Sequence, residues 1–156
     1  MKIVVLSDTH GNFNAFENVV MSNSDADLFL HLGDGATEYF KIKHIYKQTP
    51  IVMVKGNCDS ANLDENKIFK FDEIKMFACH GHNFNVKQGL DEYIKFAKSS
   101  KFNIIAYGHT HKRFIQNDSN LCIINPGSLT LPRSFGPSYG IIEILNNKVT
   151  AKIVDY

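Results

Sequence analysis

Five short apolar segments, each followed within two residues by glycine, aspartate or histidine, limit the folds open to this chain. The segments end at Leu6, Leu32, Val54, Cys79 and Tyr107. Short runs rich in β-branched and aliphatic residues predict buried strands. Helical periodicity between the first three segments indicates strand–helix–strand units, which form parallel sheets with right-handed crossovers. The pattern therefore predicts an α/β fold.

The first third of the sequence predicts three strands and two helices. The strands are expected over 2–7, 27–32 and 51–54, and the helices over 13–24 and 36–46. Apolar residues of the first helix recur at helical spacing, and Asn12 is placed to cap its N-terminus. His31 lies inside an apolar strand, where a histidine is more often a hydrogen-bonded core residue than a ligand.

The remainder of the sequence predicts mostly strands. A hairpin is expected over 66–71 and 74–79, a helix over 88–99, strands over 103–107, 113–116, 121–124, 139–144 and 148–154, and turns at 117–120 and 146–147. Many strands with three helices predict a four-layer αββα sandwich, in which two packed mixed β-sheets are flanked by helices. The 156 residues contain no linker-like segment, so a single domain over 1–156 is expected.

Charge and cysteine content exclude several classes of protein. The chain has 17 basic and 16 acidic residues and no run of like charges, which gives no indication of a polyanion-binding surface. No apolar stretch approaches the roughly 20 residues that a membrane helix needs, so no membrane partner is expected. The three cysteines form no CxxC pair and no signal peptide is recognisable, so the protein is expected in the cytoplasm.

Residues that carry chemistry lie directly after the predicted strands. They form five blocks: Asp8-Thr9-His10, Gly33-Asp34, Gly56-Asn57-Cys58-Asp59, His80-Gly81-His82 and Gly108-His109-Thr110-His111. A single Asp-x-His or Gly-Asp carries little weight, because short patterns of this kind arise by chance. Ligands of open α/β sheets bind beyond the carboxyl ends of the strands, so five such ends predict one shared site.

The order of the five blocks resembles that of the calcineurin-like metallophosphoesterase superfamily. The family pattern is D-x-H, then G-D, then G-N-H-D/E, then a lone H, then G-H-x-H, and the blocks follow this order over residues 8–111. The short length, the Gly-Asn-Cys-Asp block and a later Asn125-Pro126-Gly127-Ser128 segment resemble the small bacterial and archaeal phosphodiesterase branch. The resemblance implies a phosphodiesterase, with a monoesterase as the alternative, that hydrolyses small phosphate esters by attack of a metal-bound hydroxide.

The resemblance also implies a set of metal ligands. Asp8, His10 and His111 would hold one ion, Asn57, His80 and His109 the other, and Asp34 would bridge them. Carboxylate, imidazole and amide ligands without thiolate suit borderline divalent ions, with Mn²⁺ expected first and Ni²⁺, Fe²⁺ or Zn²⁺ as alternatives. A pair of such ions lowers the pKa of a bridging water and holds the phosphoryl oxygens during in-line attack.

Cys58 departs from the family pattern, in which a histidine at this place stabilises the transition state or protonates the leaving group. A thiol is a weaker donor than an imidazolium, which argues against transferring the full mechanism. His82 is a candidate substitute, and the alternative is a solvent-exposed loop histidine. The expected catalytic set is Asp34, Asn57, Cys58, Asp59 and His82, with Asp59 orienting a partner.

Two other functions fit the same resemblance. One is a non-catalytic protein-binding scaffold, as in a retromer subunit of similar size and fold that has lost key ligands; the seven intact ligands argue against it. The other is a nuclease, but the near-neutral charge and the presence of only two arginines, Arg113 and Arg133, weigh against a nucleic acid polymer as partner. The 12 Phe and 6 Tyr residues fit either a core or a homo-oligomer interface.

Overall fold

The computed structural model describes residues 1–118 and 120–156, so Ser119, within the predicted turn at 117–120, lies outside the described residues. The strands are β1 (Lys2–Leu6), β2 (Leu28–His31), β3 (Ile51–Met53), β4 (Asn66–Phe71), β5 (Ile74–Cys79), β6 (Ile104–Ala106), β7 (Phe114–Asn117), β8 (Cys122–Asn125), β9 (Ser138–Leu145) and β10 (Lys148–Asp155). The α-helices are α1 (Phe13–Ser22), α2 (Ala36–Ile45) and α3 (Asp91–Ser99), and a short 3₁₀ helix, η1, covers His82–Phe84. In this described part of the chain, no helix is long and apolar enough to cross a membrane.

The strands form two mixed sheets of five strands each. The first sheet has the order β10-β9-β1-β2-β3, and the second has the order β4-β5-β6-β8-β7. In the first sheet, β1, β2 and β3 run parallel, with Val5 opposite Leu30, and β9 and β10 are antiparallel to their neighbours. In the second sheet, β5, β6 and β8 run parallel, and the edge strands β4 and β7 are antiparallel.

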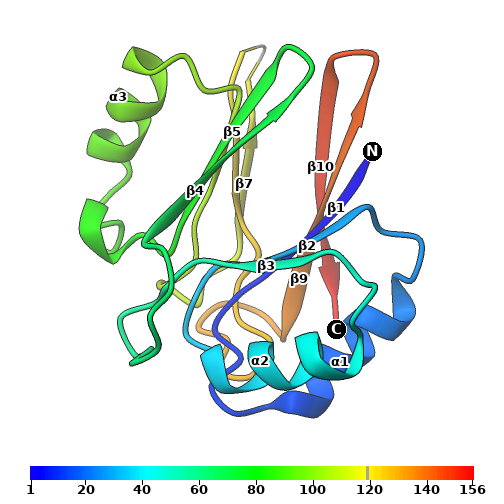
Figure 1. Cartoon of the computed structure of the whole chain (residues 1–156). Coiled ribbons are helices and arrows are strands. Elements are labelled where there is room, and N and C mark those ends of the chain that lie inside the picture. The colour runs from blue at the N-terminus through cyan, green and yellow to red at the C-terminus, as the bar shows by residue number, and fades with distance from the viewer. Residues whose placement is uncertain (119) are drawn as a thin grey trace.

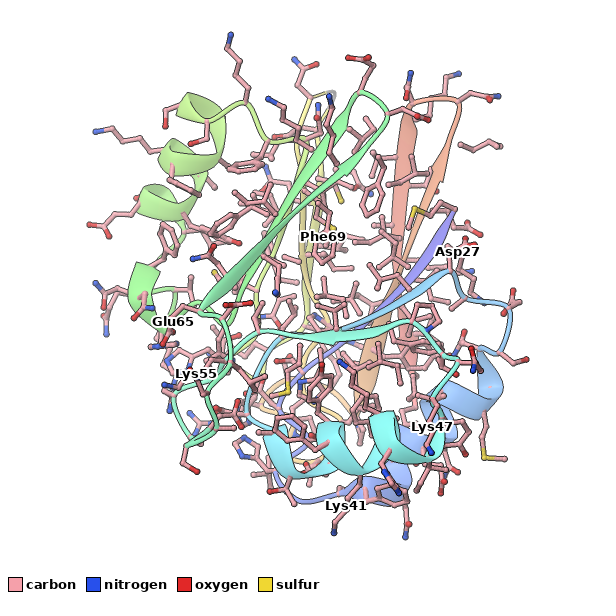
Figure 2. All side chains as sticks on the ribbon, in the orientation of Figure 1. Asp27, Lys41, Lys47, Lys55, Glu65 and Phe69 are labelled. Carbon is pink, nitrogen blue, oxygen red and sulfur yellow. The ribbon has the colours of Figure 1, made fainter. Side chains whose placement is uncertain are left out.

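Apolar residues on both faces of each sheet form three layers of packed side chains, which lie between the four layers of helices and sheets. Along β1, Ile3 and Val5 belong to the layer between the two sheets, whereas Val4 and Leu6 pack with α1 and α2. Figure 1 shows α1 and α2 on one side of the sandwich and α3 on the opposite side. Side chains such as Phe69 of β4 fill the space between the sheets (Figure 2). This arrangement confirms the predicted αββα sandwich.

The outer face of the second sheet is covered by α3 and by aromatic rings. The ring of Phe77 in β5 lies 4.9 Å, centroid to centroid, from that of Phe96 in α3 and 5.4 Å from that of Phe102. Tyr93 of α3 is fully buried, and its hydroxyl donates to the carbonyl of Ala106 in β6 at 3.0 Å. Both apolar area and a buried hydrogen bond therefore attach α3 to the sheet.

Two predicted helix boundaries are wrong by two or more residues, for local reasons. The predicted hairpin, in contrast, matches β4 and β5 residue for residue. Helix α1 ends at Ser22 rather than at residue 24, because the side chain of Asn23 donates to the carbonyl of Val19 and closes the last turn. Helix α3 begins at Asp91 rather than at residue 88, because Gly89 has a φ of +150°, far from helical values. The sequence pattern does not predict η1.

Replacement of Tyr93 by phenylalanine is expected to lower the free energy of unfolding by about 1–2 kcal/mol, because the carbonyl of Ala106 loses a buried donor. Chemical denaturation followed by circular dichroism measures the change. Tyr156→Phe is the matched control, since the Tyr156 hydroxyl also forms a hydrogen bond, with Asn18 at 3.1 Å, but is exposed. Equal losses in the two variants would show that burial of the Tyr93 hydroxyl adds nothing.

Candidate metal centre

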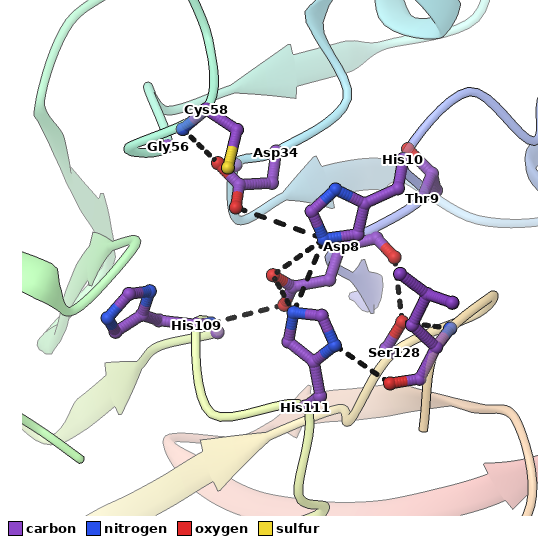
Figure 3. A network of polar contacts seen from close by, with 12 residues as sticks. Asp8, Thr9, His10, Asp34, Gly56, Cys58, His109, His111 and Ser128 are labelled. Carbon is purple, nitrogen blue, oxygen red and sulfur yellow. Dashed lines mark hydrogen bonds and ion pairs between the residues drawn. The ribbon is translucent and has the colours of Figure 1, made fainter. Parts of the chain in front are cut away.

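The carboxyl ends of strands from both sheets meet at one place. Strand β1 leads to Asp8 and His10, β2 to Asp34, β3 to Asn57, β5 to His80, and β6 to His109 and His111. The structure brings all seven residues into one connected group, part of which is drawn in Figure 3. The convergence follows from the strands that precede these residues, as the strand-end argument predicts.

The first set of donor atoms belongs to Asp8, His10 and His111. The Oδ1 of Asp8 lies 3.1 Å from the Nε2 of His111 and 3.8 Å from the Nε2 of His10, and the two Nε2 atoms are 3.3 Å apart. The Nδ1 of His111 donates to the carbonyl of Leu131 at 2.7 Å, which leaves its Nε2 to act as a ligand. One carboxylate oxygen and two imidazole nitrogens therefore face one another.

The second set of donor atoms belongs to His80, Asn57 and His109. The Nε2 of His80 lies 3.0 Å from the Oδ1 of Asn57 and 3.2 Å from the Nδ1 of His109. The Nδ1 of His80 donates to the carbonyl of Leu32 at 2.6 Å, so its Nε2 is again the atom left for a ligand. Burial, followed by the charges of His80 and Lys87, lowers the pKa of His109 to about 4, which keeps this ring neutral.

Asp34 lies between the two sets. Its Oδ2 is 3.4 Å from the Nε2 of His80 and 3.9 Å from the Nε2 of His10. Its Oδ1 accepts the backbone N–H of Cys58 at 2.8 Å. Burial alone would raise the pKa of Asp34, but the hydrogen bond and charge of His80 outweigh it and hold the pKa well below its ordinary value. The ionised carboxylate therefore has ligand atoms of both sets as neighbours.

The donor atoms fit divalent metal ions. The Oδ1 of Asp8 is buried and has no hydrogen-bond partner among the described residues, which is costly for a carboxylate oxygen unless a cation binds it. Three overlapping groups bring ligand atoms within 4.8 Å of one another: Asp8, His10 and His111; Asp8, Asp34 and His80; and His10, Asp34 and Cys58. The first two groups contain only carboxylate and imidazole donors, which suit borderline ions, whereas the third adds the thiol of Cys58.

The backbone at five of the seven residues adopts a conformation that is rare for side chains other than glycine. Asp8, His10, Asp34, His109 and His111 have φ angles of 54°, 41°, 59°, 66° and 56°. This left-handed region is uncommon for residues with a Cβ, and such residues cluster at functional sites. Sharp turns of this kind allow residues two apart in the chain, such as His109 and His111, to direct their rings to different sets.

The carboxylate of Asp59 holds the loop after β2 against the loop after β3. Its oxygens accept four backbone N–H groups, from Asp34 at 2.8 Å, Gly35 at 3.0 Å, Ala36 at 2.9 Å and Gly56 at 2.8 Å. Because Ala36 begins α2, the carboxylate also lies at the positive end of a helix dipole. The contacts of Asp59 place the backbone of Asp34 and thereby its side chain.

Cys58 and His82 both lie beside predicted ligands. Burial, the hydrogen bond to Asp34 and the charge of Asp34 raise the pKa of the Cys58 thiol, so it carries its proton. The ring of His82, in η1, has its centroid 5.5 Å from that of His80, and its Nε2 lies 3.6 Å from Glu65. Burial followed by the charge of His80 lowers the pKa of His82. Cys58 contacts Asp34, and His82 lies beside His80. Both residues therefore remain candidates for proton donation.

His31 is a hydrogen-bonded core residue, as predicted. Its Nδ1 accepts the N–H of Gly33 at 3.2 Å, and its Nε2 donates to the hydroxyl of Thr9 at 3.0 Å. Thr9 in turn donates to Glu38 at 2.7 Å. Burial lowers the pKa of His31 to about 4, so the ring is neutral. These bonds support the loop after β1 without adding a ligand.

Three supporting residues are assigned no role by the sequence pattern. The hydroxyl of Ser128 donates to the carbonyl of Asp8 at 2.7 Å and accepts the N–H of Leu131 at 2.9 Å (Figure 3). Glu38 of α2 accepts the N–H of Gly11 at 2.7 Å. The Asn-Pro-Gly-Ser segment is the only sequence signal for Ser128, and nothing in the pattern distinguishes Glu38 or Leu131 from ordinary helix and loop residues.

The fold and the centre together define a class of protein. An αββα sandwich whose strand ends bring carboxylate, imidazole and amide donors together is a candidate protein for binding divalent metal ions. The chain belongs to the calcineurin-like phosphoesterase superfamily, whose domain profile matches residues 1–147. It is therefore a metal-dependent phosphoric ester hydrolase, and the resemblance found in the five sequence blocks is confirmed.

Relatives cover almost the whole chain. A probable metallophosphoesterase of Methanocaldococcus jannaschii is 32% identical over 158 residues, which span 99% of this chain and 81% of the relative. A protein of the same organism named as a phosphodiesterase is 27% identical over 161 residues, spanning 92% of this chain and 93% of the relative. The crystal structure of a conserved Streptococcus pneumoniae protein, described as a predicted phosphoesterase, has a TM-score of 0.84 at 25% identity and covers 99% of this chain and 88% of that one.

Asp59→Asn is expected to lower the free energy of unfolding by about 2–3 kcal/mol, because an amide cannot accept the four N–H groups that the carboxylate accepts. Divalent-ion affinity is expected to fall as well, since Asp34 loses its support. Thermal melts and metal titrations measure the two effects. Asp64→Asn, at an exposed position five residues away, is the control. Native stability in Asp59→Asn would show that the four hydrogen bonds do not hold the loops together.

Proposed function

We propose that this chain is a dinuclear phosphodiesterase that hydrolyses small phosphate esters, with residues 1–156 forming one phosphoesterase domain. The position of Asp34 between two sets of donor atoms carries the proposal. A carboxylate with neighbours in both sets is suited to a pair of ions about 3.5–4 Å apart. A mononuclear site would need only one of the two sets.

Each set of residues would hold one of the two ions. Asp8, His10 and His111 would bind one ion, Asn57, His80 and His109 the other, and Asp34 both. Mn²⁺ is the first choice for such donors, and Ni²⁺, Fe²⁺ and Zn²⁺ are alternatives. When bound, the ions supply Lewis-acid activation of water and of the phosphoryl oxygens. Within the protein itself, Asp59 keeps Asp34 in place, and Cys58 and His82, beside Asp34 and His80, are the candidates to protonate the leaving group.

The choice of a small diester rests on two observations. The relative from M. jannaschii that is named as a phosphodiesterase supports a diester over a monoester. The net charge of +1 supports a small substrate over a nucleic acid polymer, whose binding depends on many phosphate contacts.

Three free cysteines, of which Cys58 is exposed, support a reducing compartment such as the cytoplasm.

Removal and return of metal tests the proposal. Protein treated with a chelator is expected to lose hydrolysis of bis(p-nitrophenyl) phosphate and to regain it with Mn²⁺ or a similar ion, with two ions bound per chain by metal analysis. Absence of any bound divalent ion, together with no activity under any added ion, would contradict it.

The variant Asp34→Asn separates a dinuclear centre from a mononuclear one. It is expected to lower kcat/KM by more than about 100-fold and to reduce the bound metal below two ions, because the shared carboxylate loses its charge. Asp25→Asn, which changes the same net charge at an exposed position, is the control. Two bound ions and a near-native rate in Asp34→Asn would exclude the bridging role.

Cys58→Ala tests the thiol as proton donor. A positioned general acid contributes about 10²–10⁴-fold, and its loss slows esters with poor leaving groups far more than activated ones. We expect less than about a tenfold effect on an alkyl ester, since a thiol with a raised pKa donates poorly. His82→Ala is expected to slow turnover with unchanged metal content. If Cys58→Ala lowered the hydrolysis rate of alkyl esters by 100-fold or more and left that of activated esters unchanged, the thiol would be the proton donor.

A further inference from the structure

A basic depression opens beside the candidate metal centre. It has a volume of about 410 Å³, and its lining includes Lys87, Tyr107, Thr110, Lys112, Phe114 and Arg133. These residues come from the loop after η1, from the segment between β6 and β7, from the first residue of β7, and from the loop before β9. Among the described residues, the lining contains three cations and no carboxylate.

The basic depression is joined to the centre through the backbone. Thr110 stands between His109 and His111 in the chain, so the segment that carries two predicted ligands also forms a wall of the depression. The backbone N–H of Arg133 donates to the carbonyl of His111 at 2.8 Å. Lys87, from the loop after η1, contributes a further cation to the lining. The depression therefore borders the segment that carries His109 and His111.

The three cations of the basic depression form no ion pair with other described residues. Within residues 1–118 and 120–156, the side chains of Lys87, Lys112 and Arg133 form no ion pair, whereas the neighbouring Arg113 pairs with Asp155. Three like charges around one hollow repel one another unless an anion binds between them. Because basic and acidic residues nearly balance over the whole chain, this local excess of positive charge is a distinct feature.

We propose that the basic depression binds a second, non-scissile phosphate group of the substrate. The inference rests on the proposed function and narrows its substrate class to phosphodiesters in which one ester arm carries a further phosphate. Lys87, Lys112 and Arg133 supply charged donors for phosphate oxygens. The ring of Phe114 provides an apolar wall for the arm itself.

A single terminal phosphate fits this surface better than a nucleic acid backbone does. Polymer binding uses a track of roughly 6–10 phosphate contacts. The depression offers three cations in one place, which is enough for one dianionic group. Recognition of one remote phosphate would select substrates by the length of the arm between the two phosphates.

The test uses pairs of p-nitrophenyl phosphodiesters whose second arm is a short alkyl chain ending either in a hydroxyl or in a phosphate. The native, metal-loaded protein is expected to prefer the phosphate-tailed ester in kcat/KM by about tenfold or more at one arm length. The triple variant Lys87→Gln, Lys112→Gln, Arg133→Gln is expected to lose this preference. The preference should also weaken as salt is raised, because salt screens exposed charges.

A second triple variant controls for net charge. Lys41→Gln, Lys47→Gln and Lys95→Gln removes the same charge from exposed positions on or beside α2 and on α3, the first two of which are labelled in Figure 2. The control is expected to keep the native preference. No preference in the native protein at any arm length, or equal preferences in the native protein and the Lys87, Lys112 and Arg133 variant, would overturn the inference. Loss of the preference in the control would do the same.

Binding without turnover separates this inference from the proposed function. Calorimetric titration of chelator-treated protein with propyl phosphate and with inorganic phosphate is expected to show binding that the Lys87, Lys112 and Arg133 variant weakens at least about fivefold. Equal binding by the two proteins would overturn the inference even if diesters are hydrolysed. If binding depends on the three cations but no diester is hydrolysed with any metal, the basic depression stands as a phosphate site and the proposed function fails. Cation-dependent binding of inorganic phosphate without a preference among the esters would overturn its assignment to the substrate.

Discussion

The complete burial of the Asp8 carboxylate is the constraint on which the rest of the centre depends. A buried charge is tolerated only when donors or cations surround it, and here they come from the other sheet. The N–H of His109 donates to Oδ2 at 3.1 Å, and His111 approaches Oδ1. Ser128 binds the carbonyl of the same residue. Burial alone would raise the pKa of Asp8, but the imidazole of His111, the charge of His80 and the hydroxyl of Ser7 lower it, so the carboxylate stays ionised.

The succession of strands along the chain could be predicted from local patterns, and the candidate ligands from the family resemblance of the residues that follow those strands. An apolar run followed by Asp8 or His80 marks a strand end wherever it occurs, and parallel strands bring such ends together. Residues that act through contacts between loops could not be predicted in the same way. Asp59 was expected to orient a partner, but nothing local indicates that its four partners are backbone amides of two different loops. Glu38 looks like any polar residue on a helix surface.

The left-handed backbone at the centre was also invisible to sequence patterns, because the residues that adopt it are not glycines. Hydrogen bonds between loops offset its cost: the N–H of Asp8 donates to Gly33 at 3.0 Å, and that of His10 donates to Asp34 at 3.1 Å. Each turn is thus held by the neighbouring turn as well as by its own residues. Side chains fixed in this way are positioned before any substrate arrives, which lowers the reorganisation that catalysis would require.

The donation of Ser128 to Asp8, across 120 positions of the chain, has a consequence for the order of folding events. Contacts between residues so far apart in sequence tend to form late, because closing a long loop costs conformational entropy before the contact can stabilise the chain. Local pieces such as the β4–β5 hairpin can form earlier. The candidate metal centre is therefore expected to be completed late in folding. Bound metal would slow the unfolding of the finished protein much more than it would speed the first steps of folding.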